Sequence, residues 1–249
     1  MFSLAGRHAL VTGANTGLGQ AIAVGLARAG ADIIVAGRSR PDETGEAVRA
    51  LGRRFHAISA DLGRIEDLPR VAEEAHAAFG HVDILVNNAG IIRRADSLDF
   101  SLEDWDAVMD VNLKSVFFLS QAIARQWVAD NRGGKIINIA SMLSFQGGIR
   151  VPSYTASKSG LAGLTRLLAC EWAGRGINVN AIAPGYFATN NTEALRADEG
   201  RNCDILARIP AGRWGDPSDL AGAAVFLASS AADYMHGAIV PVDGGWLAR

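Results

Sequence analysis

The stretch H-A-L-V-T-G-A-N-T-G-L-G, residues 8–19, predicts a buried strand, a glycine-rich turn and the start of a long helix. Such a turn offers free backbone N–H groups and the positive end of a helix dipole to a pyrophosphate. Its glycines follow the spacing GxxxGxG, which differs from the commoner dinucleotide fingerprint GxGxxG. A glycine-rich turn can simply reverse the chain, but this one directly follows the first predicted strand and opens a helix. We therefore predict a dinucleotide site at Gly13, Asn15, Thr16, Gly17, Leu18 and Gly19.

Outward from this stretch, short β-rich runs alternate with longer helical patterns. The predicted strands are His8–Thr12, Asp32–Ala36, Arg54–Ala57, Ile84–Asn87, Lys135–Ala140, Asn178–Ala183 and Ala238–Val240. The predicted helices include Leu18–Ala29, Thr44–Leu51, Leu68–Phe79, Leu102–Ala129, Tyr154–Ala173 and Pro217–Ser229. This alternation implies a parallel sheet with helices on both faces and right-handed crossovers. No repeat or linker interrupts it, so residues 1–249 are expected to form one Rossmann-like, doubly wound α/β domain with seven strands.

The bulk composition excludes several classes of function. The 249 residues are 49% hydrophobic, enough for a large core, and their net charge of −2 offers no basic field for nucleic acid or an anionic membrane. No apolar run approaches the roughly 18 residues of a spanning helix, and the N-terminus does not resemble a secretory signal. Cys170 and Cys203 stand alone like free thiols in a reducing compartment, so we expect a cytoplasmic protein. The five histidines show no metal-ligand spacing, and no metal is expected.

The end of the second predicted strand bears on the choice of dinucleotide. An acidic residue near this position bonds the ribose hydroxyls of NAD, whereas an arginine accommodates the 2′-phosphate of NADP. This chain has Gly37-Arg38 here and no acid until Asp42. A solvated arginine at a strand end is also common. The pattern favours NADP and leaves NAD as the alternative.

Two further strand ends carry residues suited to a cofactor. Asp61-Leu62 closes the third predicted strand and could touch the adenine, and N-N-A-G follows the fourth. Ligands in open α/β sheets bind at the carboxyl ends of the strands, which is where all of these motifs fall. The predicted cofactor contacts at these ends are Asp61, Leu62, Asn88, Ala89 and Gly90.

The stretch K-I-I-N-I-A-S, residues 135–141, and the helix after it supply groups for proton transfer. Residues four apart share a helical face, so Tyr154 and Lys158 can point at the same place. A fixed positive charge nearby favours the phenolate, which predicts a Tyr154 pKa below its ordinary value of about 10. Ser141, at the end of the strand, can bond the oxygen whose proton Tyr154 gives or takes. A YxxxK spacing alone is a common accident in helices.

With its three glycines, N-N-A-G, Asn112, Ser141 and Y-x-x-x-K, the chain resembles the short-chain dehydrogenase/reductase family over essentially its whole length. The resemblance implies that Tyr154 is the acid/base and that Ser141 orients the substrate oxygen. It also implies that Lys158 lowers the Tyr154 pKa and binds the nicotinamide ribose, and that Asn112 anchors a water of the proton relay. Further cofactor contacts implied by the family are Tyr154 itself, Pro184, Gly185 and Thr189.

Several segments, among them S-M-L-S-F-Q-G-G-I-R-V-P-S-Y-T-A-S-K-S-G and the terminal V-D-G-G-W-L-A-R, resemble a subgroup that acts on deoxy-keto sugar acids of the 2-dehydro-3-deoxy-D-gluconate type. The resemblance implies reversible hydride transfer on a secondary alcohol or ketone. Members of this subgroup are generally NAD-linked, from which Gly37-Arg38 departs. Alternatives are a gluconate 5-dehydrogenase or a 3-oxoacyl-carrier-protein reductase and, outside enzymes, a catalytically silent dinucleotide-sensing protein.

A sugar acid requires groups that hold its carboxylate and hydroxyls. A guanidinium grips a carboxylate through two parallel hydrogen bonds, and Arg150 and Arg94 flank the expected cleft. Residues 186–212 form a long polar insertion after the sixth predicted strand, which is typical of a lid over a site. Arg150 is the first choice for the carboxylate, and the other predicted substrate residues are Arg94, Gln146, Tyr186 and Asn191.

Self-association is expected from apolar residues on more than one face of the two longest predicted helices. The family usually forms homotetramers, which the resemblance therefore implies. Trp246 and Leu247, near the C-terminus, are expected to be covered by a partner subunit.

Overall fold

The computed structural model describes residues 1–249, which form a seven-stranded parallel sheet in the order β3-β2-β1-β4-β5-β6-β7. The predicted fold class is thereby confirmed, and every predicted strand is present to within two residues at each end. The sheet reverses direction of growth between β1 and β4, where such folds bind ligands. The strands are β1 (His8–Thr12), β2 (Asp32–Gly37), β3 (Phe55–Ser59), β4 (Ile84–Asn87), β5 (Gly134–Ile139), β6 (Ile177–Pro184) and β7 (Ile239–Val242).

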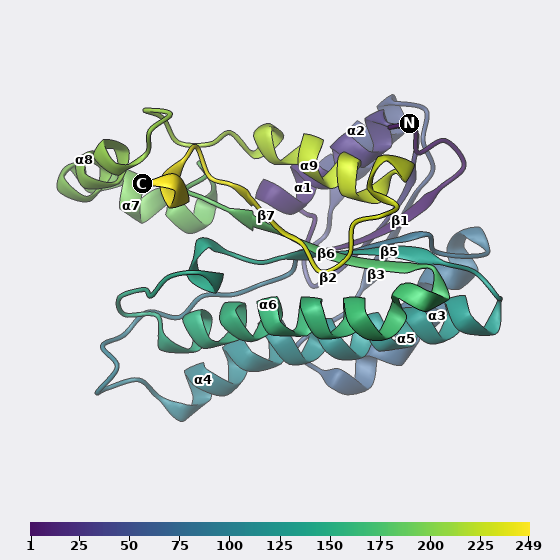
Figure 1. Ribbon diagram of the computed structural model, residues 1–249, viewed down its shortest axis with the longest axis horizontal. Helices are drawn as coiled ribbons and strands as arrows, with labels where there is room; N and C mark the ends of the chain where they lie inside the picture. The colour runs from purple at the N-terminus through teal and green to yellow at the C-terminus, as the bar shows by residue number, and fades with distance from the viewer.

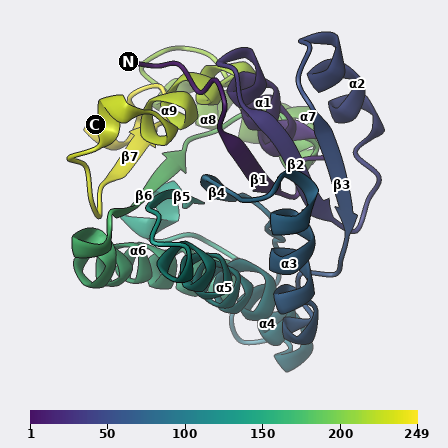
Figure 2. The same cartoon turned by 90° about the vertical axis from the view of Figure 1, so that its right-hand side faces the viewer.

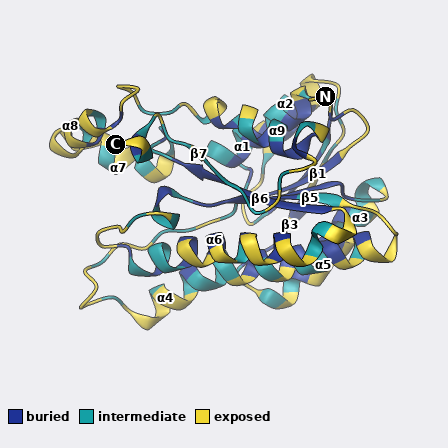
Figure 3. Ribbon diagram, in the orientation of Figure 1, coloured by how far each residue is buried: buried dark blue, intermediate teal, exposed yellow.

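Helices cover both faces of the sheet, with α1, α2 and α9 on one side and α3 to α6 on the other (Figures 1 and 2). Successive strand residues point to opposite faces. In β1, Ala9 and Val11 pack into the core beneath α1 and α9, whereas Leu10 packs into the core beneath α3 and α5. The helices are α1 (Gly17–Arg28), α2 (Asp42–Ala50), α3 (Leu68–Phe79), α4 (Leu102–Met109), α5 (Ser115–Ala129), α6 (Pro152–Trp172), α7 (Glu193–Ala197), α8 (Glu199–Arg208) and α9 (Ala221–Ala228). Figure 3 shows the sheet as the most deeply buried layer.

The helical stretch predicted at Leu102–Ala129 is interrupted by a π-helical turn, Asp110–Lys114, between α4 and α5. π-bulges of this kind occur often at functional sites. Leu102–Ala129 is long and apolar enough to cross a membrane by length and composition, and 44% of its most apolar window is buried inside the fold. Trp127 and Ile123 belong to the core between the sheet and helices α3 and α5. This packing is that of a core helix.

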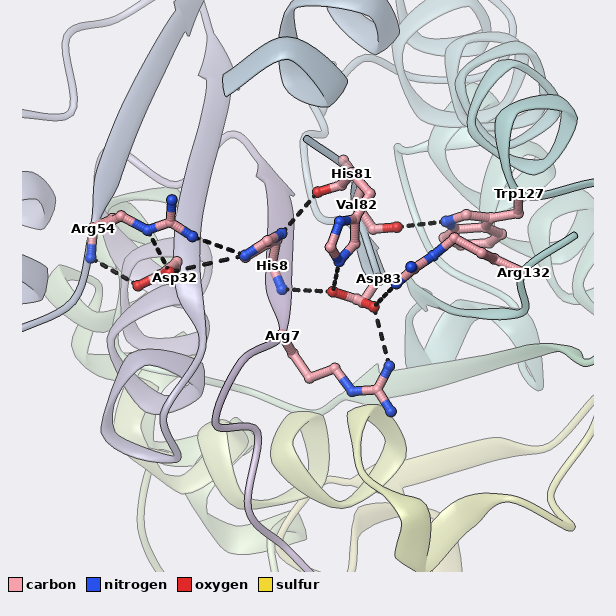
Figure 4. Close-up of polar contacts among 9 residues, drawn as sticks. All are labelled: Arg7, His8, Asp32, Arg54, His81, Val82, Asp83, Trp127 and Arg132. Carbon is pink, nitrogen blue, oxygen red and sulfur yellow. Dashed lines mark hydrogen bonds and ion pairs between the residues drawn. The ribbon is translucent and has the colours of Figure 1, made fainter. Parts of the chain in front are cut away.

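A polar cluster at the amino ends of the strands holds β1, β4 and α5 together (Figure 4). The buried Asp83 carboxylate accepts hydrogen bonds from Arg7 (3.0 Å), Arg132 (3.1 Å) and the His8 backbone N–H (2.9 Å). Burial by itself would raise the pKa of this carboxyl, but these partners hold it below its usual value. Asp83 therefore stays ionised in the folded chain at neutral pH, paired on several sides.

Two histidines of the same cluster lie close together although they are far apart in sequence. His8, His81 and Asp83 bring three possible ligand atoms within 4.8 Å of one another. His8 Nδ1 faces the His81 carbonyl oxygen (3.0 Å) and His8 Nε2 faces the Arg54 guanidinium (2.9 Å). Arg54 already occupies His8 Nε2, and the two Asp83 oxygens already accept hydrogen bonds from Arg7, Arg132 and the His8 N–H. The donor set suits a structural cluster of ion pairs and not a metal centre.

Candidate functional site

The turn between β1 and α1 forms a cradle that side chains would fill. Gly13 (φ +64°) and Gly17 (φ +62°) adopt the left-handed conformation that favours glycine. A Cβ atom on Gly13 would lie 2.9 Å from the Ala89 Cα, and one on Gly19 would collide with the Asn88 side-chain amide. The first turn of α1 contains no acidic residue, and no side chain caps its N–H groups. An anionic group can therefore approach these N–H groups, so the cradle fits the phosphates of a dinucleotide.

Hydrogen bonds behind the cradle join the ends of β1 and β4. Asn88 Nδ2 donates to the carbonyl oxygens of Thr12 (2.9 Å) and Gly13 (3.0 Å). The Thr12 hydroxyl accepts the backbone N–H groups of Asn88 and Ala89, each at 3.0 Å. The N-N-A-G motif thus shapes the cradle as well as lining it. Sequence reasoning missed Thr12, whose position as the last residue of the strand before Gly13 was the available signal.

The end of β2 lies beside the same cradle. A Cβ atom on Gly37 would lie 3.8 Å from the Gly13 backbone. Arg38 follows, with an exposed side chain that forms no ion pair, whereas Arg40 pairs with Asp42 at 3.2 Å. The Arg38 guanidinium is therefore free to meet an anion at this edge of the site.

The predicted adenine contacts lie at the end of the neighbouring strand β3. Leu62 is buried in the core, so its side chain supports this edge from below. Asp61 is half-buried, and its Oδ1 accepts the backbone N–H of Gly63 at 3.0 Å. Asp61 Oδ1 therefore orders the loop, and its Oδ2 forms no hydrogen bond within the chain.

Ser141, Tyr154 and Lys158 come together where β5 leads into α6. The buried Lys158 ammonium donates to the Ile139 carbonyl oxygen (2.6 Å) and lies 5.6 Å from the centroid of the Tyr154 ring. The Ser141 hydroxyl acts to lower the pKa of Tyr154, and it also accepts the Leu143 backbone N–H at 3.2 Å. Ser144 donates to the Lys158 carbonyl oxygen (2.7 Å) and so holds the turn after Ser141 against α6.

The expectation of a lowered Tyr154 pKa is wrong for the chain alone. Burial raises the pKa of the phenol above 10, and the Ser141 hydroxyl and the Arg94 charge offset this only in part. Burial also lowers the pKa of Lys158 from 10.5 to about 8. The lysine has no carboxylate partner, and its ammonium is directed at a backbone carbonyl. The spacing of four residues placed the two groups correctly but carried no information on desolvation.

Asn112 lies in the π-helical turn and is fully buried. Its side chain accepts the Ile91 N–H (2.8 Å) and donates to the Ile91 carbonyl oxygen (2.9 Å). It also approaches the Ser157 hydroxyl (3.4 Å), which donates to the Tyr154 carbonyl oxygen (2.9 Å). Asn112 is thereby connected both to the segment after N-N-A-G and to the helix that carries the tyrosine. Sequence reasoning did not identify Ser157 as part of this connection.

The two predicted carboxylate-binding arginines have different surroundings. Arg150 is exposed and pairs with Asp96, with 3.3 Å between Nε and Oδ1. Arg94 forms no ion pair, and its charge acts on the Tyr154 hydroxyl. Arg94 Nη2 also reaches the Asn191 carbonyl oxygen at 3.5 Å, a long contact to the insertion after β6. Arg150, the first choice from sequence, is therefore already paired with a carboxylate, whereas Arg94 is unpaired and its charge reaches the tyrosine.

The insertion 186–212 folds into a short 3₁₀ turn followed by α7 and α8. Thr189 begins it with a capping box to Thr192, and a Cβ atom on Gly17 would lie 3.8 Å from the Thr189 side chain. Thr189 thus faces the phosphate cradle from the other side of the site. The preceding Pro184 is buried at the end of β6, and the backbone of Gly185 approaches Asp243 so closely that a side chain would collide.

Tyr186 and Gln146 contact the C-terminal segment of the same chain. The Tyr186 ring lies 4.7 Å from that of Trp246, and Gln146 Oε1 accepts the Trp246 indole N–H at 3.3 Å. Trp246 is only 5% exposed within the single chain. The expectation that Trp246 needs a partner subunit to cover it is therefore wrong, because residues of the insertion cover it. The half-buried Leu247 packs against the same cluster.

A doubly wound parallel sheet, a phosphate cradle at its switch point and an adjoining serine, tyrosine and lysine define a dinucleotide-linked oxidoreductase. Residues 13–247 match the family described as enoyl-(acyl carrier protein) reductase. The chain belongs to the short-chain dehydrogenase/reductase family.

Among the members of this family, several dehydrogenases of sugar acids are similar to the chain over its full length. The chain is 66% identical over 248 residues to the 2-dehydro-3-deoxy-D-gluconate 5-dehydrogenase of Escherichia coli (strain K12), covering 100% of this chain and 98% of the relative. A 2-deoxy-D-gluconate 3-dehydrogenase structure from Agrobacterium tumefaciens, with bound NADP, is 65% identical with a TM-score of 0.94, covering 100% and 99% of the two chains. A gluconate 5-dehydrogenase structure from Beutenbergia cavernae, also with NADP, is 54% identical with a TM-score of 0.95 and the same coverage.

Proposed function

We propose that this protein catalyses reversible NAD(P)-dependent hydride transfer on a secondary alcohol or ketone carbon of a 2-dehydro-3-deoxy-D-gluconate-type sugar acid. The observation that carries the proposal is the 66% identity, over the full chain, to an enzyme named for that substrate. The site supports it, because Ser141, Tyr154 and Lys158 adjoin a cradle that fits a dinucleotide.

A bound nicotinamide would supply or accept the hydride. The residues of the chain move the proton. Tyr154 takes the hydroxyl proton in oxidation and returns it in reduction, while Ser141 donates a hydrogen bond to the substrate oxygen. Lys158 provides positive charge that favours the phenolate, and Asn112 holds the Ile91 backbone that follows N-N-A-G. The phosphates would be held by the cradle residues Gly13, Asn15, Thr16, Gly17, Leu18 and Gly19.

NADP is the preferred cofactor in this proposal. Arg38 is exposed, unpaired and next to the cradle, where a 2′-phosphate would need a guanidinium. The NADP found in the Agrobacterium and Beutenbergia structures supports the same choice.

Initial rates at 340 nm with 2-dehydro-3-deoxy-D-gluconate test both parts of the proposal, with NAD and NADP side by side. We expect turnover, a higher kcat/KM with NADP, and a loss of that preference in Arg38→Ala but not in the control Arg40→Ala. A strong NAD preference that Arg38→Ala leaves unchanged would refute the role of Arg38. Protein that binds a cofactor but does not turn over the sugar acid would refute the substrate.

Gluconate 5-dehydrogenase activity is the second candidate, favoured by the 54% identity to the Beutenbergia protein. Gluconate in the same assay separates the two activities through their kcat/KM values. A catalytically silent dinucleotide sensor would bind NADP without turnover of either compound.

We further propose that the chain forms homotetramers. We also propose that it works in the cytoplasm. An apolar hollow of about 540 Å³ lies between α5 and α6, and its lining includes the exposed Phe118 and Leu167 and the small Gly160 and Gly163. A helix of a second copy could cover it. Light scattering should give a mass above the 26.2 kDa of one chain, reduced by Phe118→Glu. A monomeric wild-type protein would contradict the assembly. Cofractionation with cytosolic markers tests the location.

A further inference from the structure

Arg208, the last residue of α8, lies beside the loop that begins at Ser141. Its neighbours Ile205 and Ile209 are buried in an apolar cluster with Met142 and Trp246. Met142 directly follows Ser141, so this cluster fixes α8 against the loop that carries the serine. Figure 1 shows α8 and the C-terminus together at one end of the molecule. The position of Arg208 is therefore determined by buried contacts on both sides of it in the sequence.

The Arg208 side chain is oriented but lacks an anionic partner. Its guanidinium carbon lies 4.0 Å from the centroid of the Trp246 ring, a cation–π contact that limits how the guanidinium can turn. Its one hydrogen bond runs from Nη2 to Gln146 Oε1 at 3.3 Å. The same oxygen also accepts the Trp246 indole N–H at 3.3 Å. A neutral amide oxygen shared at these distances is a weak partner for a guanidinium, which bonds carboxylates more strongly.

Three other arginines already pair with carboxylates. Arg93 pairs with Asp104 (3.0 Å), Arg150 with Asp96 (3.3 Å) and Arg213 with Asp219 (2.6 Å). Arg94 and Arg196 contact only backbone carbonyl oxygens, and neither is held on an aromatic ring. Arg208 alone combines a fixed orientation, an exposed position and the absence of a carboxylate.

We infer that Arg208 binds the carboxylate of the sugar acid, a carboxylate oxygen replacing Gln146 Oε1 at the guanidinium. The inference rests on the proposed function and adds a specificity-determining residue to it. Gln146, which the sequence suggested as a hydroxyl ligand, then holds Arg208 in place before the substrate arrives. Trp246 keeps the guanidinium directed toward Gln146 in both states. Trp246 can stay in place during the exchange, whereas the Gln146 side-chain amide turns away from the guanidinium.

The test compares the sugar acid with its methyl ester, which lacks the negative charge, under saturating NADP. Arg208→Gln is expected to raise KM for the acid by about 10–100-fold, the effect of losing a charge-assisted hydrogen bond, and to leave kcat within about threefold. KM for the ester should be nearly unchanged. Arg208→Lys keeps the charge but not the planar fork, so its KM for the acid should lie between those of wild type and Arg208→Gln. Arg201→Gln, on the same exposed helix, is the matched control.

Each outcome decides a different point. Absence of wild-type turnover with the sugar acid overturns the proposed function and this inference with it. Turnover in wild type with an unchanged acid KM in Arg208→Gln overturns only the role of Arg208. Equal increases for acid and ester, together with a lower Tm, would show that Arg208 merely supports α8 and would also overturn the inference. A selective increase for the acid at unchanged Tm supports it.

Discussion

Replacing Tyr154 with phenylalanine is expected to lower kcat/KM by about 10²–10⁴-fold, the usual contribution of a positioned acid or base. The substitution removes one oxygen from a half-buried ring, so the fold and the cradle at Gly13 should persist. Cofactor binding, measured by calorimetry, should therefore stay within a few fold of wild type. Tyr234→Phe, which alters a fully exposed tyrosine, is the control and should retain full activity. Substantial turnover by Tyr154→Phe would refute the mechanism.

The same tyrosine predicts how oxidation depends on pH. The phenolate is the form that takes a proton, and burial raises the pKa of Tyr154 above 10 in the chain alone. Because deprotonation becomes more complete as the pH rises, kcat/KM for oxidation should increase from neutral pH toward alkaline pH. Reduction uses the protonated phenol, which predominates until the pH approaches this pKa, so kcat/KM for reduction should stay level and fall only in strongly alkaline solution. A flat profile in both directions would indicate that Tyr154 does not exchange the proton.

The sheet and its ligand-binding edge could be predicted because their signals are local. Apolar runs such as Ile84–Asn87 must be strands when they alternate with helices, and parallel strands bring Gly13 and Asn88 to one edge. The conformations of the glycines followed from the same motif. The N-N-A-G motif gave the correct place for Asn88 but not its bonds to Thr12, since those depend on how two strands end side by side.

Other features could not be predicted, because they depend on contacts between distant segments. The π-helical turn around Asn112 follows from how the helix fits the Ile91 loop, and helical periodicity does not encode it. Trp246 is covered by the insertion after β6, more than thirty residues away, so its apolar character suggested a partner subunit instead. Arg208 lies in a polar helix whose charges all resemble solvated residues until the contact with Trp246 is known.

Replacing Lys158 with methionine is expected to lower kcat/KM by about 10–10³-fold without lowering Tm. The loss of activity follows because a nearby positive charge shifts the pKa of an acid/base group by about 1–3 units. The retained stability follows because the ammonium is buried without a carboxylate, and burial lowers its pKa from 10.5 to about 8. That shift corresponds to a cost of roughly 3 kcal/mol for the charged lysine in the folded chain. Replacing the lysine removes this cost, but losing the hydrogen bond to the Ile139 carbonyl offsets about 1–3 kcal/mol of that gain.

The pH dependence of stability tests whether the buried charge of Lys158 destabilises the fold or whether methionine simply replaces lysine without effect. The folded pKa of Lys158 lies below its unfolded value, so the unfolded chain binds more protons between about pH 8 and 10.5. In that interval Lys158 makes the free energy of unfolding rise with pH in wild type, and Lys158→Met lacks this contribution. The stability difference between variant and wild type should therefore shift in favour of wild type as the pH rises, as denaturant titrations at pH 7 and 10 would show. Lys135→Met is the contrast, because Lys135 bonds Asp233 (2.6 Å) and Asn178 (2.9 Å) and its loss should lower Tm while activity persists. If Lys158→Met is less stable than wild type at pH 7, the buried ammonium stabilises the fold. That result would contradict the idea that the lysine is kept for catalysis at a cost to stability.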